Sequence, residues 1–480
     1  MSRPFDAARY AGLLEGLEAT EIAWSKLERT KRIDPEYFLK HHLRNQAVLS
    51  YHALQSVADC AKVADGNHFA ISDEFVEDGI PYYRGQDVSG QFFVEQALPM
   101  GISRKAFSAP FMKRSHLREG DVLLSIIGTI GESSLVSSNR DATCSCKLAI
   151  LRPKKIVPAF LATYLRCEYG RSQTNRLTRG AVQMGLLLED MDQLMVPVTS
   201  PVMQQAIEKI IFTAREQFDA AAAALADAER QLLSALGLEN WQPPKPLSYV
   251  RRSRDAFAAG RLDAQYFQPK FDATAERLSK SFKLDTLGLL GQVLKGTTVP
   301  YSENGDIPII RSGDLGNIDG DDKFLRSTSS EPIFFLVPGD VLISSIGFGS
   351  IGKVQVFDKP GRYGTVGEVT VVRQQRINPH YLAAFLRSSA GQLQIDRFIT
   401  GATGQLHLYP RDVAKLWVPI LPGNQQTEFE KFALQAARYR IRAAELLDAA
   451  KRAVELAIED SEAAALQHLA SFDLPANTAP

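Results

Sequence analysis

The chain contains two copies of one sequence pattern, and this duplication is the feature that most constrains its fold. GDVLLS at 120–125 returns as GDVLIS at 339–344, and RIDPEYF at 32–38 returns as RLDAQYF at 261–267. The anchors recur in the same order roughly 220 residues apart, which indicates a tandem duplication of half the chain rather than a short repeat. Two copies of one fold can lie about a pseudo-twofold axis and suit a ligand with two similar, separated sites. Duplex DNA is the commonest such ligand.

Length and charge bound the possible classes of protein. A chain of 480 residues predicts two to four domains. Lys+Arg and Asp+Glu are both 55, so the net charge of zero argues against indiscriminate coating of nucleic acid but leaves room for local basic patches. The four cysteines all lie in the first copy, so we expect reduced thiols and a cytoplasmic protein. The polar N-terminus does not resemble a signal peptide, and no apolar stretch approaches the length that spans a bilayer.

Each copy has a mixed part followed by a long helix. Short Ile- and Val-rich runs such as 122–127 and 341–346 predict strands, and 158–166 and 379–387 predict interleaved helices. From Pro201 and again from Pro422, apolar residues recur at alternating steps of four and three, which is typical of a coiled-coil seam.

We therefore expect an α/β fold with two homologous α/β domains in tandem, separated and followed by long coiled-coil helices in a pseudo-twofold arrangement. The expected divisions are an N-terminal helical segment at 1–31, the first α/β domain at 32–200, a central spacer helix at 201–242, a linker at 243–260, the second α/β domain at 261–421, a C-terminal spacer helix at 422–470 and a tail at 471–480. The N-terminal segment is expected to complete the C-terminal helical part.

No set of residues predicts catalysis. Asn378-Pro379-His380-Tyr381 resembles the loop of adenine methyltransferases, but Asn378 as an N-cap and Pro379 in the first helical turn explain it better. The paired glycines at 128 and 131, and at 347, 349 and 352, lack the Lys-Ser/Thr of a P-loop and favour tight turns. No histidine stands at a metal-ligand spacing, so we expect neither a catalytic nor a metal site.

Basic and amide residues predict DNA contacts instead. One segment is rich in Lys and Arg, two Gly-rich polar loops carry Gln, and one Arg recurs in both copies, where a phosphate contact and an ion pair with Asp87 or Asp314 are open alternatives. A solvated loop remains an alternative for the basic segment. Glutamine can contact adenine through two hydrogen bonds. The candidate DNA-binding residues are Arg84, Arg104, Lys105, Lys113, Arg114, Arg176, Arg179, Gln183, Arg311, Thr403, Gln405 and His407.

The doubled order of these anchors, with long helices between them, resembles the specificity subunit of type I restriction-modification systems. The resemblance covers nearly the whole chain, and it implies that each α/β domain is a target-recognition domain that reads one half of a split DNA sequence. It implies a non-catalytic protein of phage defence whose partners are double-stranded DNA, DNA methyltransferase subunits (two of them) and restriction/translocase subunits. S-adenosylmethionine, ATP and Mg would then belong to those partners, and this chain would hold no cofactor.

Two other interpretations remain open. One is a specificity subunit of another methylation-based system, whose partner combines methyltransferase and nuclease. The other is a coiled-coil scaffold that binds only proteins, in which case the clustering of basic residues would have no function.

Overall fold

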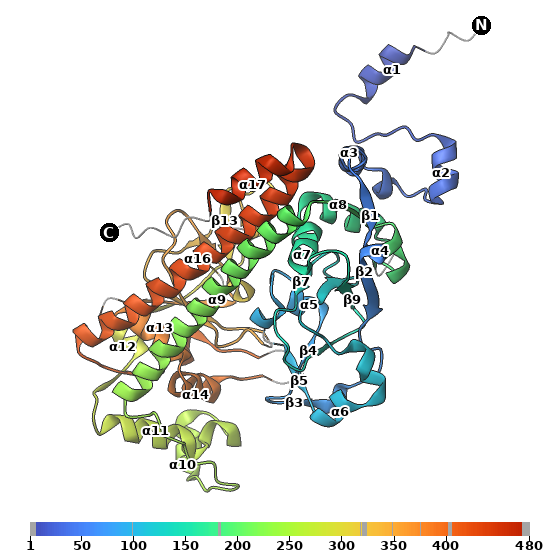
Figure 1. Ribbon diagram of the computed structural model, residues 1–480. Helices are drawn as coiled ribbons and strands as arrows, with labels where there is room; N and C mark the ends of the chain where they lie inside the picture. The colour runs from blue at the N-terminus through green and yellow to red at the C-terminus, as the bar shows by residue number, and fades with distance from the viewer. Residues whose placement is uncertain are drawn as a thin grey trace. The chain divides into compact units, whose positions relative to one another are not determined.

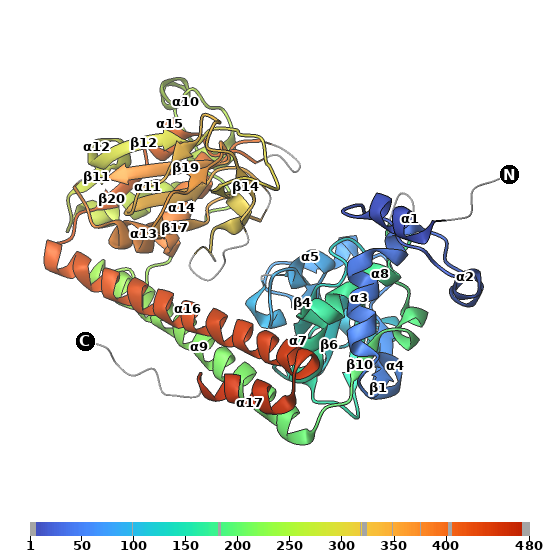
Figure 2. The same cartoon turned by 90° about the horizontal axis from the view of Figure 1, so that it is seen from above.

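The computed structural model describes residues 6–97, 99–180, 184–316, 318, 324–347, 349–374, 376–401 and 406–472. The chain folds into two compact units (Figures 1 and 2). Unit 1 comprises residues 1–215 and 445–480, and unit 2 comprises residues 216–444. Each unit is therefore assembled from one α/β part and from portions of both long helices.

Both units contain a four-stranded main sheet, a smaller four-stranded sheet and a two-stranded pair. Unit 1 has an antiparallel sheet of order β2-β9-β6-β7, a second sheet of order β3-β5-β4-β8 in which β4 and β8 are parallel, and the pair β1-β10. Its strands are β1 (Leu54–Ser56), β2 (Ala61–Asp65), β3 (Phe75–Val76), β4 (Ile80–Tyr83), β5 (Met100–Ile102), β6 (Val122–Ser125), β7 (Ser133–Leu135), β8 (Thr143–Cys144), β9 (Leu148–Pro153) and β10 (Met195–Pro197).

Unit 2 has the corresponding sheets β12-β19-β16-β17 and β14-β13-β18-β15, with β13 and β18 parallel, and the pair β11-β20. Its strands are β11 (Leu284–Thr286), β12 (Gly291–Lys295), β13 (Ile307–Ile310), β14 (Arg326–Ser327), β15 (Phe334–Phe335), β16 (Asp340–Ser344), β17 (Val354–Phe357), β18 (Gly364–Thr365), β19 (Val369–Gln374) and β20 (Trp417–Pro419). The main sheets and the two-stranded pairs have the same strand order, whereas the smaller sheets differ at one edge: β3 pairs with β5 in unit 1, and β15 pairs with β18 in unit 2. The expected mixture of helix and sheet is present in both copies.

Short helices connect the strands. In unit 1 they are α1 (Ala7–Leu14), α2 (Trp24–Thr30), η1 (Pro35–Phe38), α3 (Lys40–Leu49), α4 (Val57–Cys60), η2 (Ser72–Glu74), α5 (Gly85–Val88), η3 (Val94–Gln96), α6 (Arg104–Ser108), η4 (Pro110–Ser115), α7 (Pro158–Arg166), α8 (Glu168–Leu177), η5 (Leu188–Asp192) and α17 (Glu462–Ala470). In unit 2 they are α10 (Ser253–Ala259), η6 (Ala264–Phe267), α11 (Pro269–Ser279), α12 (Leu287–Leu290), η7 (Ser312–Asp314), α13 (Pro379–Arg387), α14 (Ser389–Phe398) and α15 (Pro410–Val413).

The main sheet of unit 2 is covered on both faces, which explains the continuous apolar run of the GDVLIS motif. Val341 and Ile343 of β16 pack in one core cluster with Phe385 of α13. Leu342, which points to the opposite face, packs in another cluster with Ile310 of the second sheet. Strand β6 of unit 1 is buried along its whole length in the same way. Each unit is thus a layer of helices, a main sheet and a smaller sheet.

The two long helices are α9 (Pro201–Ala235) and α16 (Gly423–Glu459). Proline stands at the first position of α9, and Gly237, with a φ of 65°, adopts the left-handed conformation just past its end. Within unit 2, Ala221 and Ala224 of α9 form a buried cluster with Ala436 of α16, where small side chains allow the helices to approach closely (Figure 1). Unit 2 contains the end of α9 and the beginning of α16, and unit 1 contains the complementary portions.

The RIDPEYF and RLDAQYF motifs build the same cluster at the start of each α/β part. Arg32 forms a bidentate ion pair with Asp34 at 2.6 Å, and the guanidinium lowers the pKa of that carboxyl. The Tyr37 ring lies between two guanidinium groups, with the central carbon of Arg32 at 4.7 Å and that of Arg176 at 4.2 Å from the ring centroid. Such contacts stabilise a cation over an aromatic face.

Unit 2 repeats the arrangement around Tyr266, with Arg261 at 4.8 Å and Arg397 at 4.7 Å from the ring centroid. Arg261 pairs with Asp263 at 2.7 Å, as Arg32 pairs with Asp34. Three of the four residues that both copies of this anchor share, the Arg, the Asp and the Tyr, are therefore explained by one structural cluster, which joins the start of each copy to the helix α8 or α14.

The segments outside the α/β parts differ from the simplest expectation. The N-terminal segment forms two short helices, α1 and α2, and none of the described residues up to Glu36 is buried. The stretch expected as a linker contains the helix α10. The compact units divide both long helices and so do not coincide with the predicted domains. The domain boundaries drawn from the sequence remain predictions.

Candidate nucleic-acid interface

Two loops occupy equivalent positions in the two units, and the ends of each loop are joined by backbone hydrogen bonds. In unit 1, the backbone groups of Arg179 and Gly185 exchange hydrogen bonds at 2.9 and 2.8 Å. In unit 2, Thr400 and His407 do the same at 2.9 and 2.8 Å. We call 179–185 and 400–407 the recognition loops. Gln183, Thr403 and Gln405, which we expected to contact DNA, lie outside the residues that the structure describes.

The residue that follows each recognition loop is hydrogen-bonded to the segment between the central strand and the glycine turn. The amide of Leu186 donates to the carbonyl oxygen of Ile126 at 2.9 Å, and that of Leu408 donates to Ser345 at 2.9 Å. Gly128 and Gly131 have φ values of 88° and 83°, so the expected tight turn is confirmed there. In sequence, the glycine motif and the polar loop are separated by α7 and α8 in unit 1 and by α13 and α14 in unit 2. The fold brings them together in both units.

The recurring arginine also lies near this turn. Arg84 pairs with Asp87 at 3.1 Å, and Arg311 pairs with Asp314 at 3.2 Å, while each Asp also accepts the backbone N–H of its Arg at 2.8 Å. Thr129 of the glycine turn donates to the carbonyl oxygen of Gly85 at 3.1 Å. Of the two roles left open, the structural ion pair is present in both units. Side-chain exposures of 32% and 38% leave part of each guanidinium open to solvent.

The basic segment of unit 1 forms α6 and η4 on the smaller sheet. Lys105 and Lys113 are exposed, and none of the described residues pairs with them. Arg104 pairs with Asp141, and Arg114 lies 3.4 Å from Asp65, both as exposed pairs. Surface pairs of this kind are weak, so these cations can exchange their partners for phosphate.

Aromatic stacking supports this segment from below. The His116 ring stacks on Phe107 at a centroid distance of 3.9 Å, and Phe69 packs on Phe111 at 4.7 Å. The His116 ring also hydrogen-bonds to the carbonyl oxygen of Phe107 at 2.8 Å. The backbone that carries the exposed cations is therefore held by one contact to the buried Phe107 and by one aromatic contact at the surface.

Three of the expected contacts have structural roles, and one of the three is too buried to reach DNA. Arg176 is only 8% exposed, because its guanidinium stacks on Tyr37 and donates to the Tyr37 carbonyl oxygen at 2.8 Å. It is held inside unit 1, so we withdraw it as a contact to DNA phosphate. Arg179 pairs with the fully buried Asp190 and has a side-chain exposure of 41%, so it holds its loop while remaining partly accessible. His407 is paired through its backbone, and its ring stacks on Tyr409.

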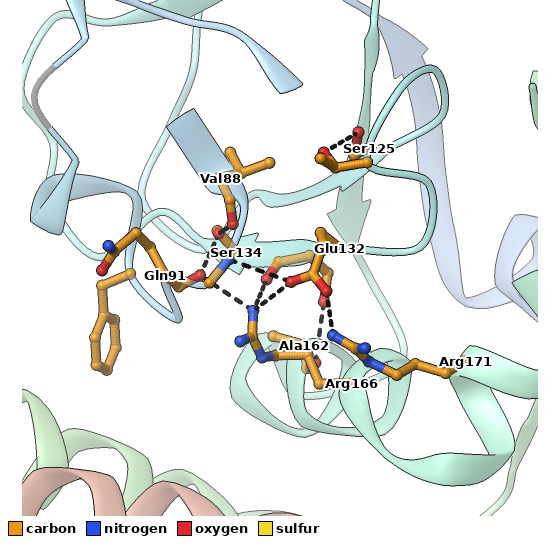
Figure 3. Close-up of polar contacts among 12 residues, drawn as sticks. Val88, Gln91, Ser125, Glu132, Ser134, Ala162, Arg166 and Arg171 are labelled. Carbon is orange, nitrogen blue, oxygen red and sulfur yellow. Dashed lines mark hydrogen bonds and ion pairs between the residues drawn. The ribbon is translucent and has the colours of Figure 1, made fainter. Parts of the chain in front are cut away.

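A partly buried ionic cluster behind the glycine turn of unit 1 was not predicted from the sequence. Glu132, directly after Gly131, pairs with Arg171 of α8 and lies 3.8 Å from Arg166 of α7 (Figure 3). Its other contact is the backbone N–H of Gly90, at 3.3 Å. Burial alone would raise the pKa of Glu132, but Arg166 and Arg171 lower it on balance. This carboxylate therefore fixes the glycine turn to the helices that lead into the recognition loop.

The Asp of each GDVL motif also has a structural role. Asp121 accepts the N–H of Arg118 at 3.0 Å, and Asp340 accepts that of Val337 at 2.9 Å, which confirms the expected turn chemistry. Arg373 of β19 adds a bidentate pair to Asp340 at 2.8 Å. Asn378 accepts the N–H groups of His380 and Tyr381, so the methyltransferase-like string is a helix N-cap, as predicted.

No three His, Cys, Asp or Glu side chains lie close enough to hold a metal ion in the part of the chain that the structure describes. None of the described helices is long and apolar enough to cross a lipid bilayer.

Three solved structures are similar to the chain over most of its length. The S subunit of the type I restriction-modification system from M. genitalium is 14% identical, and the match covers 87% of this chain and 95% of that one, with a TM-score of 0.34. The HsdS subunit from Thermoanaerobacter tengcongensis is 18% identical over 88% of this chain and 96% of that one, with a TM-score of 0.26. A chain from a study of complex assembly and conformational transition of the type I R-M system is 16% identical, over 88% and 97%, with a TM-score of 0.26. The chain matches no family model and no curated protein sequence.

Proposed function

We propose that the chain is the non-catalytic specificity subunit of a type I restriction-modification complex, and that it reads a bipartite, asymmetric DNA target. The observation that carries the proposal is the repetition of one loop site on one fold, with different residues in each copy. The recognition loop of unit 1 begins Arg179-Gly180, whereas that of unit 2 begins Thr400-Gly401. Loops on a rigid scaffold are where sequence readout usually lies, so two divergent loops suit two different half-sites.

The partners would be two DNA methyltransferase subunits together with restriction/translocase subunits, which would hold S-adenosylmethionine, ATP and Mg. A repeated surface feature supports two copies of one partner. Ile33 and Leu262 stand at equivalent positions of the two anchor motifs and are 86% and 84% exposed. A single exposed apolar residue is ordinary, but the same one in both copies suits one partner surface used twice.

The proposal is tested by mapping methylated adenines in DNA from cells that carry this chain and its methyltransferase partner. We expect one bipartite sequence with two unlike halves separated by a fixed spacer. Absence of any methylated motif that depends on this chain, together with absence of DNA binding by the assembled complex, would favour the protein scaffold instead.

Exchange of one domain should change one half of the target. Residues 35–197 include both strands of the β1–β10 pair, in which Leu54 faces Pro197, so a replacement over this range moves the pair as a unit. We expect a chimera that carries the corresponding range of a relative to methylate a sequence with one new half and one original half. Sequencing of the methylated sites measures this, and a change in both halves would contradict the assignment of one half-site to each unit.

Charge and base readout should separate in binding experiments. Lys113→Ala with Arg114→Ala removes two exposed cations, so we expect weaker binding to all sequences and a salt dependence whose slope falls by about one unit for each phosphate that is no longer neutralised. Gln183→Ala or Gln405→Ala should instead relax one base position, at a cost of roughly 1–3 kcal/mol for a bidentate contact. Competition binding against single-base target variants distinguishes the two effects. Wild-type ranking in both glutamine variants would mean that these side chains do not read bases.

A further inference from the structure

Four guanidinium groups flank the two tyrosines of the anchor motifs, and three of them face a carboxylate. The pairs are Arg32–Asp34 at 2.6 Å, Arg261–Asp263 at 2.7 Å and Arg397–Asp272 at 3.1 Å. The fourth, Arg176, pairs with no carboxylate of the described residues. Its Nε donates to the Tyr37 carbonyl oxygen at 2.8 Å, and its Nη1 donates to Oε1 of Gln46 at 2.7 Å.

The duplicated unit shows what is missing beside Arg176. Counting from the Tyr-Phe of each anchor, Asp272 of α11 stands where Leu43 stands in α3. Leucine has no acceptor, so unit 1 lacks the carboxylate that unit 2 supplies from its own chain. Burying a cation without an opposite charge is unfavourable, because desolvation is not offset by a partner.

A cavity of about 280 Å³ opens beside Arg176, between α3 and α8. Its polar walls include Tyr37, His42, Asn45, Gln46, Ser172 and Arg176. In unit 2 the positions of His42 and Ser172 hold Phe271, which is 3% exposed, and Leu393. Unit 2 thus places apolar side chains where unit 1 has polar ones.

Arg176 is the charge that dominates this cavity. It is 8% exposed, and His42, 5% exposed, hydrogen-bonds through Nδ1 to the Ser172 hydroxyl at 2.7 Å. Burial, with the nearby His41 and Arg176, lowers the pKa of His42 to about 4, so its imidazole is neutral near pH 7. The cavity therefore presents one positive guanidinium together with neutral donors and acceptors.

We propose that this cavity binds a small oxyanion, a carboxylate or phosphate group, against Arg176, which no carboxylate of the described residues pairs with. Guanidinium recognises both groups through planar, charge-assisted hydrogen bonds. The cavity volume is several times the roughly 30 Å³ that one water occupies in the liquid, which leaves room for such a group and its substituents. The site lies in unit 1 only, because unit 2 carries its own carboxylate.

The test is calorimetric titration of the full-length protein with sodium phosphate and, separately, with sodium acetate, at constant ionic strength in chloride. We expect saturable binding of one equivalent of at least one of these anions, and the stronger of the two identifies the head group. Arg176→Gln should weaken that binding at least tenfold. Arg44→Gln removes an exposed cation from α3, the other helix that borders the cavity, and should leave binding unchanged.

Leu43→Asp provides an independent variant, since it supplies the carboxylate from the chain itself. It should abolish anion binding and raise the melting temperature in chloride relative to the wild type. The proposal is overturned if neither anion binds saturably to the wild type, or if Arg176→Gln or Leu43→Asp binds the anion as the wild type does. Should Arg176→Gln fail to fold, the Leu43→Asp titration decides.

Discussion

Replacement of Glu132 by Gln is expected to destabilise unit 1 by about 2 kcal/mol at neutral pH, between the cost of breaking an exposed ion pair and that of breaking a fully buried one. The Glu132 side chain is 18% exposed, and it is the only carboxylate that the described structure pairs with Arg166 or Arg171. Glutamine has nearly the same shape as glutamate and can still accept the hydrogen bond from the Gly90 N–H, so the lost stability reports the charge alone. Arg166, itself 15% exposed, would lose its ion pair and keep only the longer-range attraction of Asp448.

The effect should depend on pH in one direction. The two arginines lower the pKa of Glu132 in the folded protein, so its contribution to stability is complete above the pKa of the unfolded chain, near 4.5. That contribution is lost as the pH falls through the lower folded pKa. The difference in free energy of unfolding between wild type and Glu132→Gln should therefore be constant from pH 7 down to about 5 and shrink below it.

Hydrogen exchange of the amides in β6, β7 and α8 measures the free energy of unfolding of unit 1. Tryptophan fluorescence is less suitable, because Trp241 and Trp417 lie in unit 2. Arg171→Gln is the matched control, because Arg171 is 40% exposed and its loss should cost less than the loss of Glu132. Equal protection of wild type and Glu132→Gln at pH 7 would show that the cluster is not stabilising.

Those parts of the fold that depend on local pattern were predictable. The duplication follows from anchors such as GDVL, and the starts of the long helices follow from the prolines at 201 and 422 together with an apolar stripe. The helix that begins at Asn378 was also predictable, because an N-cap residue followed by proline is a local signal. These features need no knowledge of what lies across the fold.

Features that depend on distant partners were not predictable from one sequence. Glu132 meets Arg166 and Arg171 only because α7 and α8 pack behind the glycine turn. The Gly-rich polar loop that follows Arg176 predicts a surface residue, yet Tyr37, far away in sequence, stacks on Arg176 and buries it. The sequence does contain a signal for this contact. Arg176 and Arg397 recur at equivalent positions of the two copies, as do Tyr37 and Tyr266 of the anchor motifs.

The length of the long helices should set the spacer between the two half-sites. The core of unit 2 includes Ala228 and Leu232 of α9, so a heptad inserted between Leu225 and Leu232 would disturb that core. A better variant inserts one heptad after Arg215 in α9 and another after Ala444 in α16, where the compact units divide. Seven residues keep the apolar seam with a rotation of only about 20°.

Paired insertion adds about 10.5 Å of helix, which corresponds to roughly three base pairs at 3.4 Å each. We expect the methylated sequence to keep both halves and to lengthen its spacer by about that amount. Three base pairs also turn the duplex by roughly 100°, close to a third of its helical repeat, so methylation should slow even as the spacer lengthens.

A heptad in α9 alone leaves α16 unmatched against the Ala221 and Ala224 cluster and should abolish methylation. Insertion of five residues in each helix turns the seam by roughly 140° and should do the same. Methylome sequencing of the three variants decides the matter: an unchanged spacer in the paired-heptad protein would mean that the helices do not measure the distance between half-sites.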